Sequence, residues 1–134
     1  MPESTNISPS RRRLAAQFAR YATGLLLLAM FVGTHVPGSF SPAVPYSDKV
    51  IHALAFLALT LSLLLSWELS TGVLQPRHYF AVWLFCTLYG AFDEITQIPV
   101  GRTCDGLDWL ADLGGILTGL VLYRLLRPLL SRLI

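Results

Sequence analysis

Four apolar stretches, each about as long as one membrane-spanning helix, constrain this chain more than any other feature. They cover residues 14–36, 50–69, 79–98 and 107–126. A hydrocarbon core about 30 Å thick requires ~20 helical residues to cross it, and backbone groups in lipid must hydrogen-bond within their own helix. Segments that contain Pro or Gly, which end helices, separate the stretches at 37–45, 75–78 and 99–102.

Composition supports the same prediction. The chain has 134 residues, of which 54% are hydrophobic and only 13% charged. A soluble domain of this size could not keep so many apolar residues away from its surface. We therefore predict an all-α fold in the cell membrane: a four-transmembrane-helix bundle over residues 14–134, after a disordered cytoplasmic N-terminus at 1–13.

The first apolar stretch has a second interpretation, as a cleaved signal peptide, because Arg11, Arg12 and Arg13 precede it. The stretch is long for that role, and no small-x-small cleavage site stands out before Ser47. A retained helix is the prediction.

The basic residues predict the orientation. If the N-terminus is cytoplasmic, eight of the ten Lys and Arg residues lie inside and two outside, in the sense of the positive-inside rule. The inner eight are Arg11, Arg12, Arg13, Arg20, Arg77, Arg124, Arg127 and Arg132, and the outer two are Lys49 and Arg102. Both termini are therefore predicted to be cytoplasmic. No basic stripe with interleaved aromatic residues is present, so we expect no nucleic-acid partner.

With this orientation, the polar residues of three separate segments gather at the outer leaflet. They are Asp48, Lys49 and His52, then Asp93, Glu94 and Gln97, then Arg102, Asp105, Asp108 and Asp112. Ionisable groups at membrane depth are costly and usually functional. We therefore predict a site at the outer ends of the second, third and fourth stretches.

Helical phase sharpens this prediction in the last stretch. Asp105, Asp108, Asp112, Gly115 and Gly119 follow one another at spacings of three, four, three and four residues, which puts them on one stripe. The two glycines have the small-xxx-small spacing that lets membrane helices pack closely, and packing is the role that we expect for them.

The acidic residues also have a structural interpretation, as helix caps and dipole partners. It fits Asp48 and Asp105, which come just before the second and fourth stretches. It fits Asp93 and Glu94 poorly, because they lie near a helix end whose dipole disfavours anions. These two need a cationic partner, for which Arg102 is the first candidate and His52 and Lys49 are the next.

Three spaced motifs resemble the signature of the VanZ-like membrane protein family. They are Asp48-Lys49-x-x-His52, Gly90-x-x-x-Glu94-x-x-Gln97 and Gly101-Arg102-x-x-Asp105-x-x-Asp108-x-x-x-Asp112-x-x-Gly115. The similarity covers about residues 48–119, with one departure: many members carry Asn where this chain has Asp112. The resemblance implies a small multi-spanning protein, named for a member that confers teicoplanin resistance, and leaves the reaction open. A role in the cell envelope and in antibiotic resistance is the corresponding expectation.

Two functions fit these residues. The first is a binding or shielding module that holds a cell-envelope lipid or glycopeptide group at the outer leaflet, between bundle helices. Asp48, Lys49, Gln97, Arg102, Asp105, Asp108 and Asp112 would bind the group. Trp109, Tyr46 and Tyr89 would supply an aromatic wall, or act only as interfacial anchors.

The second is a membrane enzyme acting on a lipid-linked or cell-wall substrate. Glu94 or Asp93 would be the general base, His52 an acid or base near neutrality, and Arg102 an anion clamp. A divalent cation is a further candidate component, because hard cations take carboxylates. No nucleophile motif, zinc-binding histidine pair or phosphatase signature supports turnover, and the sequence specifies neither ligand nor oligomeric state.

The remaining polar residues are assigned structural roles. His35 is expected to be a solvated interfacial side chain, and Glu68 is expected to pair with Arg77 near the cytoplasmic end. Cys86 lies too deep in its helix to bridge Cys104 in the outer loop, so no disulfide is predicted.

Overall fold

The computed structural model describes residues 8–36, 47–101 and 104–130. Four helices make up the fold: α1 (Pro9–His35), α2 (Ser47–Thr71), α3 (Pro76–Gln97) and α4 (Gly106–Leu130), with the short 3₁₀ helix η1 (Ile98–Val100) after α3. The described part of the chain contains no strand. The predicted all-α fold is confirmed.

Each helix overlaps its predicted stretch, but all eight ends differ from the predicted ones by one to five residues. The largest difference is at α1, which begins at Pro9, five residues before the expected start, so that its first turns carry the arginines. Pro9 and Pro76 each occupy a first helical position, where a missing N–H costs nothing. Gly72 ends α2 with a φ of 90°, and its N–H bonds to the carbonyl of Glu68 at 2.8 Å.

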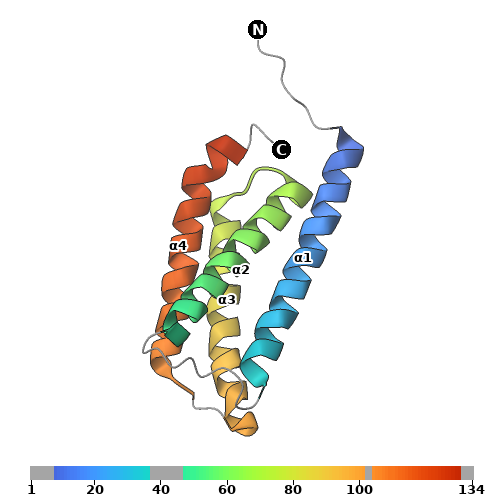
Figure 1. The fold of residues 1–134 in the computed structure, drawn as a ribbon. Coiled ribbons are helices and arrows are strands. Elements are labelled where there is room, and N and C mark those ends of the chain that lie inside the picture. The colour runs from blue at the N-terminus through green and yellow to red at the C-terminus, as the bar shows by residue number, and fades with distance from the viewer. Residues whose placement is uncertain (1–7, 37–46, 102–103, 131–134) are drawn as a thin grey trace.

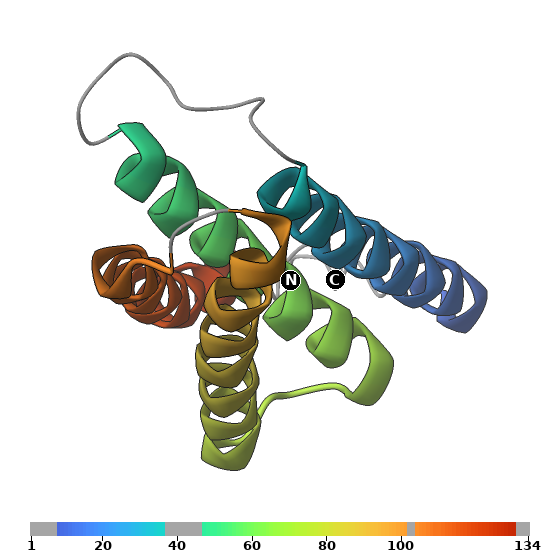
Figure 2. The ribbon, with the colours of Figure 1, turned by 90° about the horizontal axis from the view of Figure 1, so that it is seen from below.

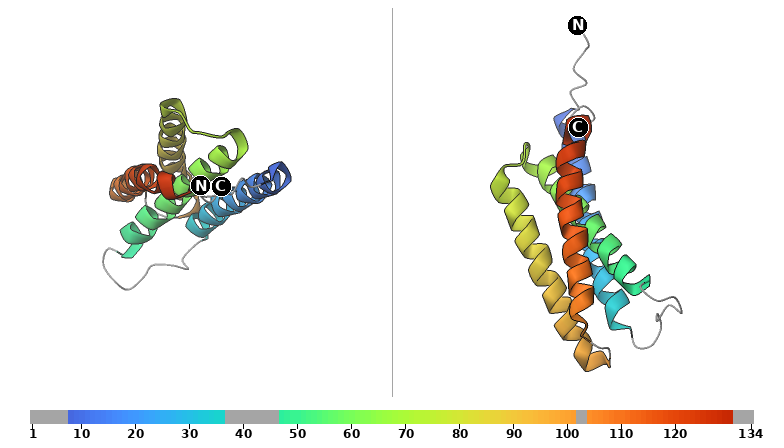
Figure 3. Two further views of the ribbon diagram at one scale, coloured as in Figure 1. Left: turned by 90° about the horizontal axis from the view of Figure 1, so that it is seen from above. Right: turned by 90° about the vertical axis from the view of Figure 1, so that its left-hand side faces the viewer.

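The helices run side by side, with consecutive helices in opposite directions, and α2 lies obliquely between α1 and α4 (Figures 1 and 2). The start of α1, the end of α2, the start of α3 and the end of α4 therefore lie at one end of the bundle, and the predicted site lies at the other (Figures 1 and 3). The most extensive helix contact joins α2 and α4.

Glycines make that contact possible. A Cβ atom at Gly115 would overlap the backbone carbonyl of Ala53, and one at Gly119 would lie 2.9 Å from the Cβ of Thr60. Because neither glycine has a side chain, the two helices approach until backbone and small side chains touch. The predicted packing role of the glycine pair is confirmed.

Three of the described helices are long and apolar enough to cross a membrane: α1, α2 and α4. Helix α3 is not one of them, because its 22 residues carry charged or polar groups near both ends. The count of four helices agrees with the sequence, whereas a fourth membrane span remains a prediction.

Glu68 pairs with a different residue from the one expected. Its Oε1 accepts a hydrogen bond from Arg127 Nε at 3.0 Å, and its Oε2 accepts one from the hydroxyl of Tyr123 at 2.7 Å. Arg77 instead lies 3.4 Å from the ring of His78. The prediction of a Glu68–Arg77 pair is wrong, because the last turns of α4 supply the partners of Glu68, whereas the start of α3 meets the end of α2 through the rings of His78 and Trp67.

Candidate functional site

The site lies where α2 begins, α3 ends and α4 begins (Figure 1). The structure brings together nine of the ten predicted site residues: Asp48, Lys49, His52, Asp93, Glu94, Gln97, Asp105, Asp108 and Asp112. The tenth, Arg102, lies outside the described residues, and so does Tyr46. The expected pairing of Glu94 or Asp93 with Arg102 therefore remains a prediction.

Lys49 joins the start of α2 to the start of α4. Its Nζ lies 2.9 Å from Asp105 Oδ2 and 2.8 Å from Asp108 Oδ1. Asp105 also caps α4, since its Oδ1 accepts the backbone N–H of Leu107 at 2.9 Å. The Lys49 hydrogen bond and the Leu107 N–H together hold the pKa of Asp105 below its usual value. Asp105 thus serves both as a cap and as an ion-pair partner.

His52 and Asp112 form a buried pair between α2 and α4. His52 is 6% exposed and Asp112 1%, and His52 Nδ1 lies 2.9 Å from Asp112 Oδ1. Asp112 Oδ2 has no hydrogen-bond partner among the described residues. A Cβ atom at Gly90 would lie 2.9 Å from this oxygen, so glycine at position 90 gives the carboxylate its space.

Glu94 lies next to this pair, on α3. Its Oε2 accepts the backbone N–H of Asp105 at 3.0 Å, its Oε1 accepts Gln97 Nε2 at 3.4 Å, and Oε1 lies 4.0 Å from His52 Nδ1. Since Lys49 contacts Asp105 and Asp108, His52 is the cationic candidate nearest to Glu94 in the described part of the site.

Asp93 is held by α1, which the sequence did not indicate. Thr34 Oγ1 donates to Asp93 Oδ1 at 2.8 Å, and Gln97 Nε2 donates to Oδ2 at 3.1 Å. His35 lies 3.8 Å from Asp93 Oδ1 and 3.0 Å from the hydroxyl of Thr96, with its side chain 14% exposed. The expectation that His35 is simply solvated was wrong. The only signal for either residue was its place near the outer end of the first stretch.

An apolar cavity of about 450 Å³ opens beside the polar cluster, between α1, α2 and α3. Its lining residues are Leu26, Ala29, Met30, Gly33, Thr34, Asp48, Ile51, His52, Ala55, Phe56 and Asp93. Most of them are apolar, while Thr34, Asp48, His52 and Asp93 lie at the end of the cavity next to the polar cluster. Tyr89 and Trp109 are not in the lining; each hydrogen-bonds to a backbone carbonyl elsewhere.

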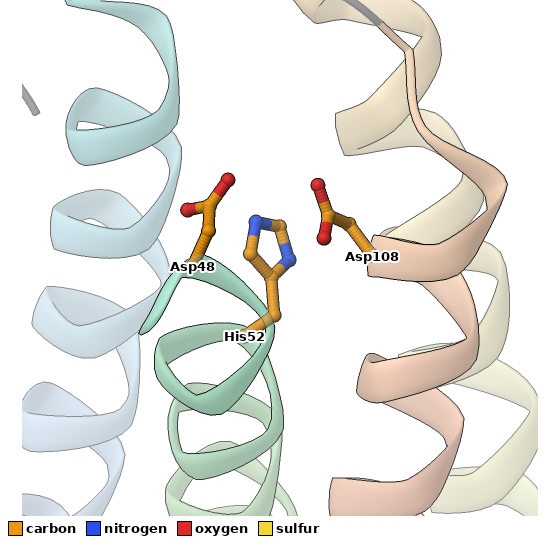
Figure 4. Close-up of side chains that lie close together, drawn as sticks. All are labelled: Asp48, His52 and Asp108. Carbon is orange, nitrogen blue, oxygen red and sulfur yellow. The ribbon is translucent and has the colours of Figure 1, made fainter. Parts of the chain in front are cut away.

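Two overlapping groups of side chains have the composition and spacing to hold a metal ion. Asp48, His52 and Asp108 form the outer trio, and His52, Glu94 and Asp112 form the inner trio. In each trio the candidate ligand atoms lie within 4.8 Å of one another. Figure 4 shows the outer trio, with the His52 imidazole between the two carboxylates.

The polar cluster lies at the ends of helices that are long and apolar enough to cross a membrane, which is the character of a helical membrane protein. A family model described as VanZ/LLP1 matches residues 7–127. The chain belongs to this family, as the three motifs had indicated. Comparisons with curated proteins and with solved structures gave no match.

Proposed function

We propose that this VanZ/LLP1 protein binds a cell-envelope lipid, or a glycopeptide group carried by one, at the outer leaflet and holds it without turnover. The observation that carries this proposal is the cavity of about 450 Å³ with apolar walls and a polar outer end. Small-molecule sites have this character: a few hundred cubic ångströms, mostly apolar, with a small number of polar groups that fix orientation.

The cavity suits an amphiphile. An acyl or prenyl chain would lie against Leu26, Met30 and Phe56, while the head group would meet Asp48 and His52. Ala29 and Gly33 line the cavity and are also exposed on α1, so the cavity opens sideways, toward the position of surrounding lipid. A lipid can enter from the bilayer by that route.

The outward orientation of the site is part of the proposal. Arg12 and Arg13 lie in the first turns of α1 and Arg127 lies in the last turn of α4, at the end of the bundle opposite the acidic cluster, which supports cytoplasmic termini. We further propose that α3 crosses the membrane beside the other three helices. Its large apolar side chains Phe85, Leu88 and Phe92 are exposed, as expected for a lipid-facing surface.

A pair of glycine substitutions tests ligand binding. Gly33 lines the cavity and Gly24 does not, although both lie on α1 with nothing within 4 Å of a Cβ atom. Gly33→Leu should fill the cavity and remove the lipid that copurifies with the protein, as measured by native mass spectrometry in mild detergent. Gly24→Leu is the matched control and should retain it. Equal lipid retention by the two variants would refute the proposed binding site.

Catalysis is the second candidate, favoured by the contact of His52 with two buried carboxylates. Glu94 Oε1 lies 4.0 Å from His52 Nδ1, and Asp112 lies on the same side of the ring. A base held by a second carboxylate is a common arrangement for proton transfer. Glu94→Gln distinguishes the functions: if it abolishes function in cells while lipid still copurifies, the chemistry of Glu94 matters and the protein is an enzyme.

A further inference from the structure

We propose that Asp48, His52 and Asp108 bind one divalent transition-metal ion, such as Zn²⁺ or Mn²⁺, at the outer rim of the cavity. The metal site does not depend on the proposed function. The role of the metal rests on the proposed function: its open coordination positions would bind an anionic oxygen group of the lipid, such as a phosphate or a carboxylate.

Backbone positions prearrange the three ligands. Asp48 and His52 are one turn apart on α2, so they share a helix face, and Asp108 lies in the first turn of α4 opposite them (Figure 4). Their candidate ligand atoms all lie within 4.8 Å of one another. Small side-chain rotations would bring all three ligand atoms to the metal–ligand distance of about 2.0–2.2 Å from one shared ion.

The orientation of His52 points independently to a ligand. The side chain is 7% exposed, and its contacts with Asp112 and Glu94 are both made by Nδ1. No described residue hydrogen-bonds to Nε2, and the ring lies between the carboxylates of Asp48 and Asp108 (Figure 4). A histidine bound to a metal usually donates its other N–H to a carboxylate, which fixes the ring. Asp112 stands in that position.

The charges at this end of the bundle also call for a cation. Six carboxylates face one lysine among the described residues, and Lys49 contacts only Asp105 and one oxygen of Asp108. The second oxygen of Asp108 and the Asp48 carboxylate stay beside a nearly buried imidazole. Like charges in a partly dry environment are costly, and one divalent ion would offset two of them.

The outer trio is better suited to a metal than the inner trio. In the inner trio, His52 would have to use Nδ1, which already bonds to Asp112 at 2.9 Å. Both oxygens of Glu94 are also engaged, by the Asp105 N–H and by Gln97. In the outer trio, His52 can offer Nε2, to which none of the residues that the structure describes hydrogen-bonds. One imidazole with two carboxylates favours Zn²⁺ or Mn²⁺ over Mg²⁺ or Ca²⁺, which prefer oxygen ligands alone.

The site also faces the proposed ligand. Asp48 and His52 line the cavity, so a metal held by them lies at its polar end. Three protein ligands leave one or more positions open, which is the arrangement of metal sites that bind a further group. An acidic rim would repel a phosphate, whereas a metal-bearing rim would attract it.

Metal titration of the full chain in detergent, after treatment with a chelator, tests the site. Electron paramagnetic resonance should show one Mn²⁺ bound per chain, and Zn²⁺ should displace it. Asp48→Asn and Asp108→Asn should each weaken Mn²⁺ binding at least tenfold. Glu68→Gln is the control, since it removes a carboxylate at the opposite end of the bundle and no proposed ligand, and its affinity should stay within threefold of the unmodified chain.

The contrary results are equally definite. Wild-type affinity in both Asp48→Asn and Asp108→Asn would overturn the proposal, provided that thermal unfolding of the metal-free variants shows that they fold. Loss of binding in Glu94→Gln but not in Asp48→Asn would place the metal in the inner trio and also overturn it. Because the titration contains no added lipid, its failure is distinguishable from failure of the Gly33→Leu test.

Discussion

His52 Nδ1 lies 2.9 Å from Asp112 Oδ1, and this contact between two buried side chains joins α2 to α4. Asp112 has no second partner for its other oxygen among the described residues, so the pair depends on one hydrogen bond. Replacing one of the two side chains should therefore lower the stability of the protein more than replacing both.

His52→Leu should destabilise the protein by about 3–5 kcal/mol, because it leaves the Asp112 carboxylate buried without a partner. Adding Asp112→Asn should recover part of that loss, since the buried charge is then gone. Thermal unfolding in detergent with a chelator present measures the four corners of this double-mutant cycle. Strictly additive effects would show that the two side chains do not interact.

The glycine contact between α2 and α4 gives a prediction with a neighbouring control. Gly115→Ala should strongly destabilise the bundle, because its new methyl group meets the backbone of Ala53 and backbone does not yield easily. The adjacent Gly114→Ala should be neutral or slightly stabilising, since nothing lies within 4 Å of its Cβ atom and alanine favours helix. Equal unfolding temperatures for the two variants would contradict the observed packing.

The sequence anticipated much of this arrangement, for identifiable reasons. Span lengths and the alternation of direction place Asp48, Glu94 and Asp108 at one end of the bundle whatever the lateral order of the helices. Periodicity similarly placed Gly115 on the contact face of its helix. These inferences need only local geometry and the preference of apolar residues for lipid.

What the sequence did not supply was the lateral order of the helices. Hydropathy does not say which helices are neighbours, so the hydrogen bond from Thr34 to Asp93 and the role of His35 were missed. For the same reason Glu68 was assigned Arg77, the nearest arginine along the chain. Its partner Arg127 is 59 residues away and becomes a neighbour only when α4 packs along α2.

The Glu68 network predicts a difference between two arginines of one helix. Arg127→Met should destabilise the protein by about 1–3 kcal/mol, because Glu68 is nearly buried and, within the described part of the chain, keeps only the Tyr123 hydroxyl as a side-chain partner. Arg124→Met is the control and should change stability little, since Arg124 is exposed. The comparison is made by chemical or thermal unfolding in the same detergent. A loss of stability in Arg124→Met as large as that in Arg127→Met would be inconsistent with the pairing of Arg127 and Glu68.

The Lys49–Asp105 ion pair predicts a pH dependence. The pKa of Asp105 in the folded state is below its ordinary value of 3.8, mainly because of the Lys49 hydrogen bond. A carboxyl group with a lowered folded-state pKa contributes stability above its unfolded pKa, and this contribution disappears as pH falls through the folded pKa. Below about pH 3.8, the protonation of Asp105 should therefore contribute to a decline in the stability of the folded protein. Asp105→Asn, measured over the same pH range, should lack that component; an unchanged profile would argue against the ion pair.

The proposed orientation leads to a labelling experiment that uses a residue already present. Cys104 is exposed and follows η1 at the site end of the bundle, whereas Cys86 is buried, so a membrane-impermeant thiol reagent on intact cells should label Cys104 alone. Gln75 lies at the opposite end, between α2 and α3. In a Cys104→Ser background, Gln75→Cys should react only after the membrane is opened. Labelling of position 75 in intact cells would reverse the orientation and place the acidic cluster at the cytoplasmic surface, where an envelope lipid of the outer leaflet could not reach it.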